Sequence, residues 1–507
     1  MDFSQALPLI HEGLMQTLAP LSLLSVFAGV FFGVIIGALP GLGPVVGITI
    51  ALPFTYSMIP SQAIALLLGI YCGAIYGGSI SAILINTPGT PSSAATVIDG
   101  FPMAKQGKAG LALGWCTFAS LFGGIFSCIV LVICGPTLAM VALSFGPVET
   151  FALVMLALTC IATVSRGSTL AGIVAGFIGL TMAVVGSDPI SGNIRFSFGL
   201  FMLSGGIGFI PVVVGIFALS EVFSRASEYI SSEPIQTVQY KRMVFPTWDD
   251  IKMRIGILIK SSAIGTAVGI LPGTGAATAC FISYAEIKRS SPRRDKMGTG
   301  EPDGVIASEA ANNAVTGGAL VPTLALGLPG DAVTAVMLGT LVLHGITPGV
   351  RLMVDNPVTV YSAFFSLGIA NVIMFFVGIF IAKIFAKLLK MPEPLLMCGV
   401  VILCLLGSYG VNSSIFDVSV TVIMGMFGFL LRRFKVPLAP LVIGIVLGPM
   451  LEINLRQGLI LTDGSFIAFF VGHPIAVGLF IVTALVLGVP LLRHFAEMRK
   501  GMTGKTA

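Results

Sequence analysis

Residues 69–90 read GIYCGAIYGGSISAILINTPGT, a long apolar run that passes into small residues and then into a Pro-Gly break. The apolar part has the length and composition of a membrane helix, whereas Pro88 and Gly89 interrupt helices. Backbone groups freed by such a break find no water in lipid, so they must be buried in protein or line a wet cavity. The segment therefore predicts a broken membrane helix beside a solute pathway.

The whole chain has the composition of an integral membrane protein. Of its 507 residues, 56% are hydrophobic and 10% are charged, whereas about a quarter of residues are charged in an ordinary soluble domain. Apolar runs long enough to cross the roughly 30 Å hydrocarbon core recur along the sequence. We predict an all-α polytopic membrane protein with re-entrant or broken helices, which excludes soluble enzyme folds.

Charge, cysteine and histidine usage argue against several other classes. The net charge of +5 lies in loops and near the C-terminus, a pattern that orients membrane helices and does not indicate nucleic acid binding. The eight cysteines and four histidines show neither CxxC pairs nor metal-ligand spacing, so no disulfide framework or metal site is predicted. No cofactor is expected.

Two halves of the chain carry the same Pro-Gly and Gly-Gly motifs in the same order. The matching pairs are 39–43 (LPGLG) with 271–275 (LPGTG), 77–79 (GGS) with 317–319 (GGA), and 86–90 (NTPGT) with 327–331 (GLPGD). Collinear motifs of this kind are harder to produce by chance than shared hydrophobicity. Because secondary transporters are commonly built from two such halves, we predict two structurally repeated halves, with an inverted arrangement favoured by precedent.

The repeat also gives the predicted domain organisation. A charged stretch that contains two prolines separates the two halves. The predicted segments are an N-terminal amphipathic segment (1–17), a first transmembrane repeat (18–220), a charged connector (221–254), a second transmembrane repeat (255–493) and a basic C-terminal tail (494–507). Within the first repeat, the spacing of Gly29, Gly33 and Gly37 predicts a close helix-packing face.

The Gly-Gly and Pro-Gly segments are the candidate substrate site. Each copy is expected to be a helical hairpin with Gly-Gly at its tip, followed by a helix that unwinds at Pro-Gly, although a plain tight turn is the alternative for the tips. Half-helix N-termini bind carboxylates, and freed carbonyls coordinate small cations. The candidate substrate-binding residues are Gly77, Gly78, Ser79, Ser81, Asn86, Thr87, Pro88, Gly89, Thr90, Gly317, Gly318, Pro329 and Gly330.

Polar residues near the second break are candidate ligands of a coupling ion, Na+ or H+. These are Asn312, Asn313 and Asp331, with structural bridging between helices as the alternative for the two amides. An intramembrane carboxylate is costly enough to be a functional candidate by default, which also applies to Glu309 and Asp99. For Asp99 we favour a position at an aqueous rim, because two lysines follow it closely.

Three longer stretches make the chain resemble the large membrane subunit of tripartite tricarboxylate transporters. They run over 76–103, 309–330 and 345–349, and Val350 departs from the proline expected next. The resemblance covers residues 18–495. It implies a multi-pass permease of the bacterial inner membrane that imports tricarboxylates or related small carboxylates by symport with an ion. It further implies two partners, a small four-helix membrane subunit and a periplasmic solute-binding protein.

Two other functions remain as alternatives to a secondary active transporter. In an ion or solute channel the broken segments would form a selectivity filter, but filters normally come from several identical loops around one axis. An intramembrane hydrolase is suggested superficially by the motif at 327–331, yet aspartyl chemistry needs two carboxylates that share a proton. No second aspartate motif of that kind occurs, so we expect no enzyme.

Overall fold

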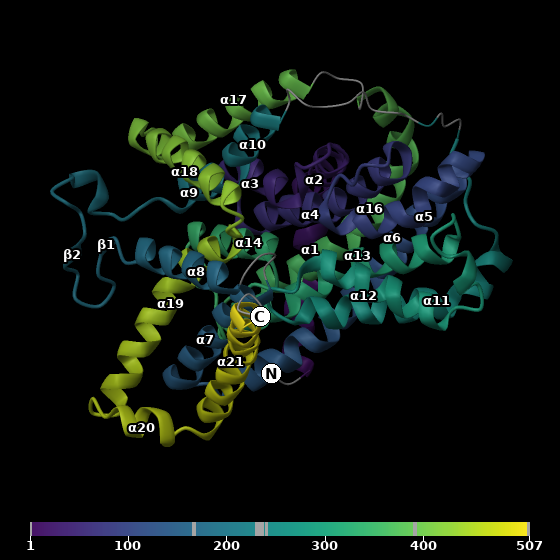
Figure 1. The fold of residues 1–507 in the computed structure, drawn as a ribbon. Coiled ribbons are helices and arrows are strands. Elements are labelled where there is room, and N and C mark those ends of the chain that lie inside the picture. Colours follow the sequence, from purple (N-terminus) through teal and green to yellow (C-terminus); the bar gives the residue numbers. More distant parts are fainter. Residues whose placement is uncertain (1–2, 165–168, 229–237, 239–241, 389–392, 504–507) are drawn as a thin grey trace. The chain divides into compact units, whose positions relative to one another are not determined.

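The computed structural model describes residues 3–164, 169–228, 238, 242–388 and 393–503, which form two compact units (Figure 1). Unit 1 comprises Met1–Ala139 and Ile210–Phe429, and unit 2 comprises Met140–Phe209 and Leu430–Ala507. Residues 229–237 and 239–241 of the predicted connector, and 504–507 of the predicted tail, lie outside the described residues.

Unit 1 is built from helices. They are α1 (Phe3–Leu18), α2 (Pro20–Ala38), α3 (Gly43–Thr55), α4 (Pro60–Ile85), η1 (Pro91–Ser93), α5 (Ala94–Met103), η2 (Ala104–Lys108), α6 (Ala109–Ala142), α9 (Phe209–Val213), η4 (Val214–Leu219), α10 (Ser220–Glu228), α11 (Trp248–Ile270), α12 (Gly275–Ser290), η6 (Arg294–Lys296), α13 (Pro302–Leu326), α14 (Ala332–Leu343), α15 (Leu352–Asp355), α16 (Pro357–Leu388), α17 (Glu393–Asn412) and α18 (Ile415–Arg433).

Unit 2 combines helices with one small hairpin. Its elements are α7 (Pro147–Val164), α8 (Thr169–Ala183), β1 (Gly186–Ser187), β2 (Ile194–Arg195), η3 (Phe201–Leu203), α19 (Ala439–Leu461), α20 (Phe466–Val471) and α21 (Pro474–Thr503). The strands pair antiparallel, with Gly186 opposite Arg195. Asp188 closes the hairpin by accepting the backbone N–H of Ser191 and pairing with Arg456 of α19 at 2.8 Å. These contacts hold the pKa of the Asp188 carboxyl well below its usual range.

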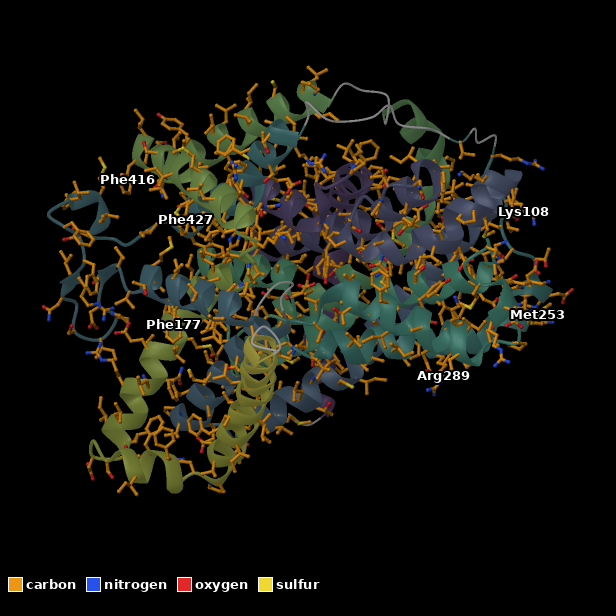
Figure 2. All side chains as sticks on the ribbon, viewed as in Figure 1. Lys108, Phe177, Met253, Arg289, Phe416 and Phe427 are labelled. Carbon is orange, nitrogen blue, oxygen red and sulfur yellow. The ribbon has the colours of Figure 1, made fainter. Side chains whose placement is uncertain are left out.

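The helices have the length and the exterior of a membrane protein. Within the described residues, nine helices are long and apolar enough to cross a bilayer. Large apolar side chains also point outward, as shown for Phe177 of unit 2, which is 65% exposed (Figure 2). In unit 1, Phe380 is 72% exposed. Such an exterior is stable in lipid, so the prediction of an all-α polytopic membrane protein is confirmed.

Helices α2 and α4 of unit 1 run side by side with their backbones in close contact (Figure 1). A Cβ atom built at Gly33 would lie 2.5 Å from the carbonyl oxygen of Ile70, and one built at Gly73 would lie 2.5 Å from that of Val30. Gly29 and Gly37 meet the backbone of α4 in the same way. The predicted glycine packing face is therefore confirmed. Helix α4 contributes glycines of its own to the same contact, including Gly73.

The pair α11 and α13 repeats this mode of packing in the second half of the chain. A Cβ atom at Gly269 would lie 2.9 Å from the carbonyl oxygen of Val315, and one at Gly318 would lie 2.5 Å from that of Thr266. Small residues thus bring the backbones of each helix pair together, as van der Waals packing in membranes requires.

Substitution of Gly33 by valine should lower the amount of folded protein. The added side chain meets backbone atoms of Ile70 and cannot be relieved by a rotamer change, so we expect a loss of about 3 kcal/mol. Gly256→Val on α11 is the matched control, because a Cβ atom there meets open space. The measurement is the yield and thermal stability of monodisperse protein in detergent; equal values for the two variants would contradict the packing role.

Candidate transport site

Two broken helices meet at the first candidate site in unit 1. Helix α2 ends at the extended residue Leu39, and α4 ends at Asn86, which has a left-handed φ of 57°. The N–H of Gly41 donates to the carbonyl oxygen of Gly89 at 3.0 Å, and the N–H of Gly89 donates to Gly78 at 3.1 Å. Backbone groups released by both breaks therefore satisfy one another, as a membrane interior demands.

The second candidate site has the same local geometry. Helix α11 ends at Leu271 with φ and ψ of −79° and 117°, against −79° and 116° at Leu39. Helix α13 ends at Gly327 with a left-handed φ of 71°. The N–H of Gly273 donates to the carbonyl oxygen of Gly330 at 2.7 Å. The predicted unwinding at both Pro-Gly motifs is confirmed.

The predicted Gly-Gly hairpin tips are wrong. Gly77 and Gly78 lie inside the continuous helix α4, and Gly317 and Gly318 lie inside α13. Their function is close approach: a Cβ atom at Gly78 would lie 2.5 Å from the hydroxyl oxygen of Thr90, and one at Gly317 would lie 2.6 Å from the backbone of Ser127. Glycine pairs in a membrane helix serve packing as readily as turning, which the motif alone does not distinguish.

The helices that follow the two breaks start with different caps. At the first break, Thr90 and Ser93 form a reciprocal capping box at the start of η1, and Thr90 is buried. At the second, Asp331 and Thr334 form the same box at the start of α14. A neutral hydroxyl thus caps one helix and a carboxylate caps the other. The N-terminus after the first break keeps its attraction for an added anion. At the second break, the carboxylate of Asp331 already compensates the positive end of the helix dipole.

Asp331 also connects the two halves of the chain. Its Oδ1 accepts the N–H of Thr334 at 2.8 Å, and its Oδ2 accepts the hydroxyl of Tyr71 on α4 at 2.5 Å. Thr323 accepts the N–H of Gly330 at 3.3 Å and so fixes the preceding Pro-Gly turn to α13. The carboxylate is therefore held where an element from each half meets.

Asn312 and Asn313 lie in the middle of α13 and are fully buried. Within the described residues, both polar side-chain atoms of Asn312 and the Oδ1 of Asn313 have no hydrogen-bond partner. Unsatisfied amides in a protein interior cost about 1–3 kcal/mol each, so they point to a ligand or a water that would complete them.

The remaining candidates have smaller structural tasks. Ser79 is buried and donates to Glu309 of α13 at 2.6 Å, and Ser81 donates to the carbonyl oxygen of Gly78 at 3.0 Å. Thr87 is exposed and donates to the carbonyl of its own helix end. Pro88 is half-buried and Pro329 is buried.

Arg225 of α10 is a residue that sequence reasoning missed. A Cβ atom at Gly41 would overlap its guanidinium group, so the cation reaches the first break. Arg225 pairs with Glu221 one turn earlier at 3.0 Å. The sequence signal is an Arg one turn after a Glu at the end of an apolar run, within the predicted connector at 221–254.

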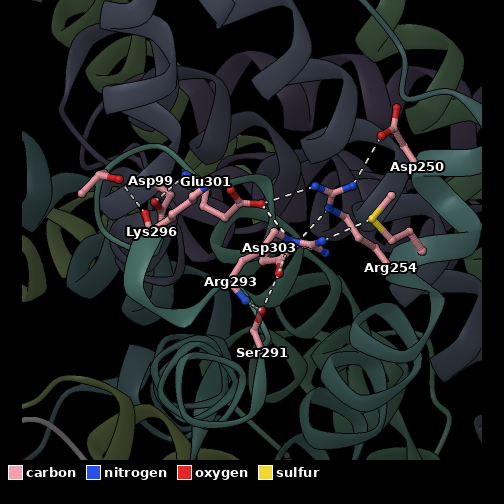
Figure 3. A network of polar contacts seen from close by, with 10 residues as sticks. Asp99, Asp250, Arg254, Ser291, Arg293, Lys296, Glu301 and Asp303 are labelled. Atoms are coloured by element: carbon pink, nitrogen blue, oxygen red, sulfur yellow. Dashed lines mark hydrogen bonds and ion pairs between the residues drawn. The ribbon is translucent and has the colours of Figure 1, made fainter.

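A network of polar contacts fixes the loop between α12 and α13 (Figure 3). Asp99 is fully buried and accepts the N–H groups of Gly298, Gly300 and Glu301, so its predicted place at an aqueous rim is wrong. Asp303 pairs with Arg254 at 2.9 Å and with Arg293 at 3.1 Å. Neighbouring lysines in sequence had suggested exposure, whereas the loop folds back over Asp99.

The fold, with its two pairs of broken helices, defines the class of multi-pass membrane proteins. The model of the tripartite tricarboxylate transporter TctA family matches residues 23–443. The chain belongs to this family, whose members are membrane components of tricarboxylate transport within a tripartite system.

The chain is also similar to two proteins of Agrobacterium vitis. An uncharacterised 52.8 kDa protein in the TAR-I ttuC' 3' region is 37% identical over 490 residues, which cover 96% of each chain. An uncharacterised protein in the TAR-II ttuC' 3' region is 34% identical over 232 residues, which cover 45% of this chain and 96% of the relative. No solved structure matches the chain with significance.

Two substitutions at Asp331 should separate its capping from its charge. Asp331→Asn keeps an oxygen that accepts the N–H of Thr334, so we expect near-wild-type stability, whereas Asp331→Ala should lose about 1 kcal/mol. Thermal unfolding of purified protein is the measurement. Asp295→Ala is the control, because that side chain is 93% exposed. Equal stability of all three variants would show that Asp331 does not cap α14.

Proposed function

We propose that the chain is the permease subunit of an ion-gradient-coupled importer of tricarboxylates or related small carboxylates in the bacterial inner membrane. The observation that carries the proposal is the pair of geometrically matched breaks with unlike caps, Thr90 at one and Asp331 at the other. A transporter that moves an anion with a cation needs one site of each kind, and broken half-helices are suited to both.

The first break suits the substrate carboxylate. The helix after it begins with a neutral capping box, and Arg225 lies beside Gly41 in the same region. A carboxylate gains from a helix N-terminus and from charge-assisted hydrogen bonds to a guanidinium. The pairing of Arg225 with Glu221 weakens the net attraction, which favours release of the anion after transport.

The second break suits the coupling ion, Na+ or H+. Asp331 supplies a carboxylate, and the unpartnered side-chain oxygens of Asn312 and Asn313 lie on α13, the helix that leads into this break. Carboxylate and amide oxygens are ligands of hard cations, and an intramembrane carboxylate is also a candidate carrier of protons.

The repeated geometry supports two related halves, and we propose that they are inverted. Equivalent hydrogen bonds join the breaks in each half, from Gly41 to Gly89 and from Gly273 to Gly330. Contacts also cross between halves in matching fashion, with α3 against α14 and α12 against α5. In such proteins one half moves against the other around a fixed site, which gives alternating access rather than a channel.

Dependence on two partners is the direct test of this function. Membership of a tripartite family supports a requirement for a small four-helix membrane subunit and a periplasmic solute-binding protein. Reconstituted alone in vesicles, the chain should take up labelled citrate poorly at low concentration, and both partners should restore gradient-dependent uptake. Full high-affinity uptake by the chain alone would contradict the proposal, and rapid flux without a gradient would favour a channel.

Substitutions at the first break test the substrate site. Thr90→Ala should weaken citrate binding about tenfold, the loss of one charge-assisted hydrogen bond. Gly89→Val should abolish binding, because its side chain would overlap backbone atoms of Gly37 and Gly78. Thr90→Ser keeps the hydroxyl and Thr137→Ala changes an exposed threonine, so both should bind normally.

Equilibrium binding of labelled citrate to purified variants is the measurement, with folding checked by thermal unfolding. Wild-type affinity in folded Thr90→Ala and Gly89→Val protein would place the anion elsewhere.

A further inference from the structure

The interior acids of unit 1 are compensated in different ways. Asp99 accepts three backbone N–H groups and the hydroxyl of Tyr284. Asp303 pairs with two arginines. Asp331 lies at a helix N-terminus. Each of these three carboxylates therefore has a positive charge or oriented amide dipoles beside it.

Glu309 has neither kind of compensation. It is fully buried in the middle of unit 1, within α13. Its Oε1 accepts the hydroxyls of Ser79, at 2.6 Å, and Thr96, and its Oε2 contacts the hydroxyl of Ser120 at 3.1 Å and the thiol of Cys116 at 3.4 Å. Within the described ranges, no Lys, Arg or His forms an ion pair with it. An ionised carboxylate there would be an unpaired charge in a low-dielectric interior.

The partners of Glu309 suit a group that changes its protonation state. A hydroxyl can donate to a carboxylate and, after rotation, accept from a protonated carboxyl. The three hydroxyl neighbours can therefore satisfy both forms without movement of the backbone. The neighbours contact the carboxyl oxygens directly, with Ser79 at 2.6 Å, Ser120 at 3.1 Å and Cys116 at 3.4 Å.

The other titratable and charged groups around Glu309 do not supply a positive charge that would compensate its ionised form. Cys116 comes from α6, and Cys280 of α12 lies within electrostatic range. On α5, Asp99 lies one turn from Thr96 and is engaged by the loop before α13. On α13 itself, Asp303 is engaged by Arg254 of α11. From α4 the contacting group is the neutral hydroxyl of Ser79.

We propose that Glu309 is a proton-binding site and that its proton is coupled to transport, in addition to the cation assigned to the second break. A proton adds to one carboxyl oxygen when the site opens to one side, and the same O–H bond breaks when it opens to the other. The unpartnered side-chain atoms of Asn312 and the unpartnered Oδ1 of Asn313, one turn further along α13, are polar atoms that a water delivering this proton would contact. The proposal rests on the proposed function for its role in coupling, but proton binding itself is independent of transport.

Infrared difference spectroscopy of the purified full chain across a pH series tests proton binding directly. The C=O band of a protonated carboxyl shifts in heavy water, which identifies it. We expect such a band in the wild type, its loss in Glu309→Gln and its retention in Asp331→Asn. Absence of the band in the wild type at every pH, its survival in Glu309→Gln, or its removal by added Na+ at constant pH would overturn the proposal.

A second variant tests the proposal even if Glu309→Gln does not fold. Ser79→Ala combined with Ser120→Ala removes one hydroxyl from each carboxyl oxygen and keeps the acid. The pH midpoint of the band should shift in this variant, and an unshifted midpoint would contradict the assignment.

A transport assay distinguishes failure of this proposal from failure of the proposed function. In vesicles with both partners, Glu309→Gln should lose proton-driven accumulation of labelled citrate while retaining citrate exchange. Proton-driven accumulation in this variant would overturn the coupling role. An infrared band assigned to Glu309 in a wild type that moves no carboxylate would contradict the proposed function alone.

Discussion

A membrane helix can stop in the bilayer only where other protein groups take up its freed hydrogen bonds. In this chain the bonds from Gly41 to Gly89 and from Gly273 to Gly330 meet that requirement, because each joins two broken helices to each other. These bonds need the close approach that glycines provide between α2 and α4 and between α11 and α13. The hydrogen bonds at the breaks therefore depend on the glycine packing of the helix pairs.

The two breaks share a backbone geometry and differ in charge. Thr90 leaves the helix after the first break open to an added anion, whereas Asp331 already supplies a negative charge at the second. The hydroxyl of Tyr71 bridges from one half of the chain to that carboxylate at 2.5 Å. Under the proposed function, a change in the occupancy or protonation of this site would reach an element of the other half through that hydrogen bond, as the coupling of two solutes requires.

Buried charge is distributed unevenly over unit 1. Asp303 and its arginines form a paired cluster, in which removal of one partner would cost about 3–5 kcal/mol. That cluster and Asp99 anchor the loop between α12 and α13. Glu309 lies less than two turns along the same helix and has only neutral partners. The contrast separates the carboxylates that fix this loop from the one that we propose binds a proton.

The sequence was sufficient for the membrane class, the broken helices at Pro-Gly and the packing face at Gly33, because hydrophobic length and Pro-Gly chemistry act locally. The glycine pairs at 77–78 and 317–318 were misinterpreted as tips, since the partner backbone that explains them comes from a distant segment. The burial of Asp99, the approach of Arg225 to Gly41 and the neutral surroundings of Glu309 likewise join residues far apart in the chain. The local sequence pattern carries no information on such long-range contacts, because they depend on how the helices pack.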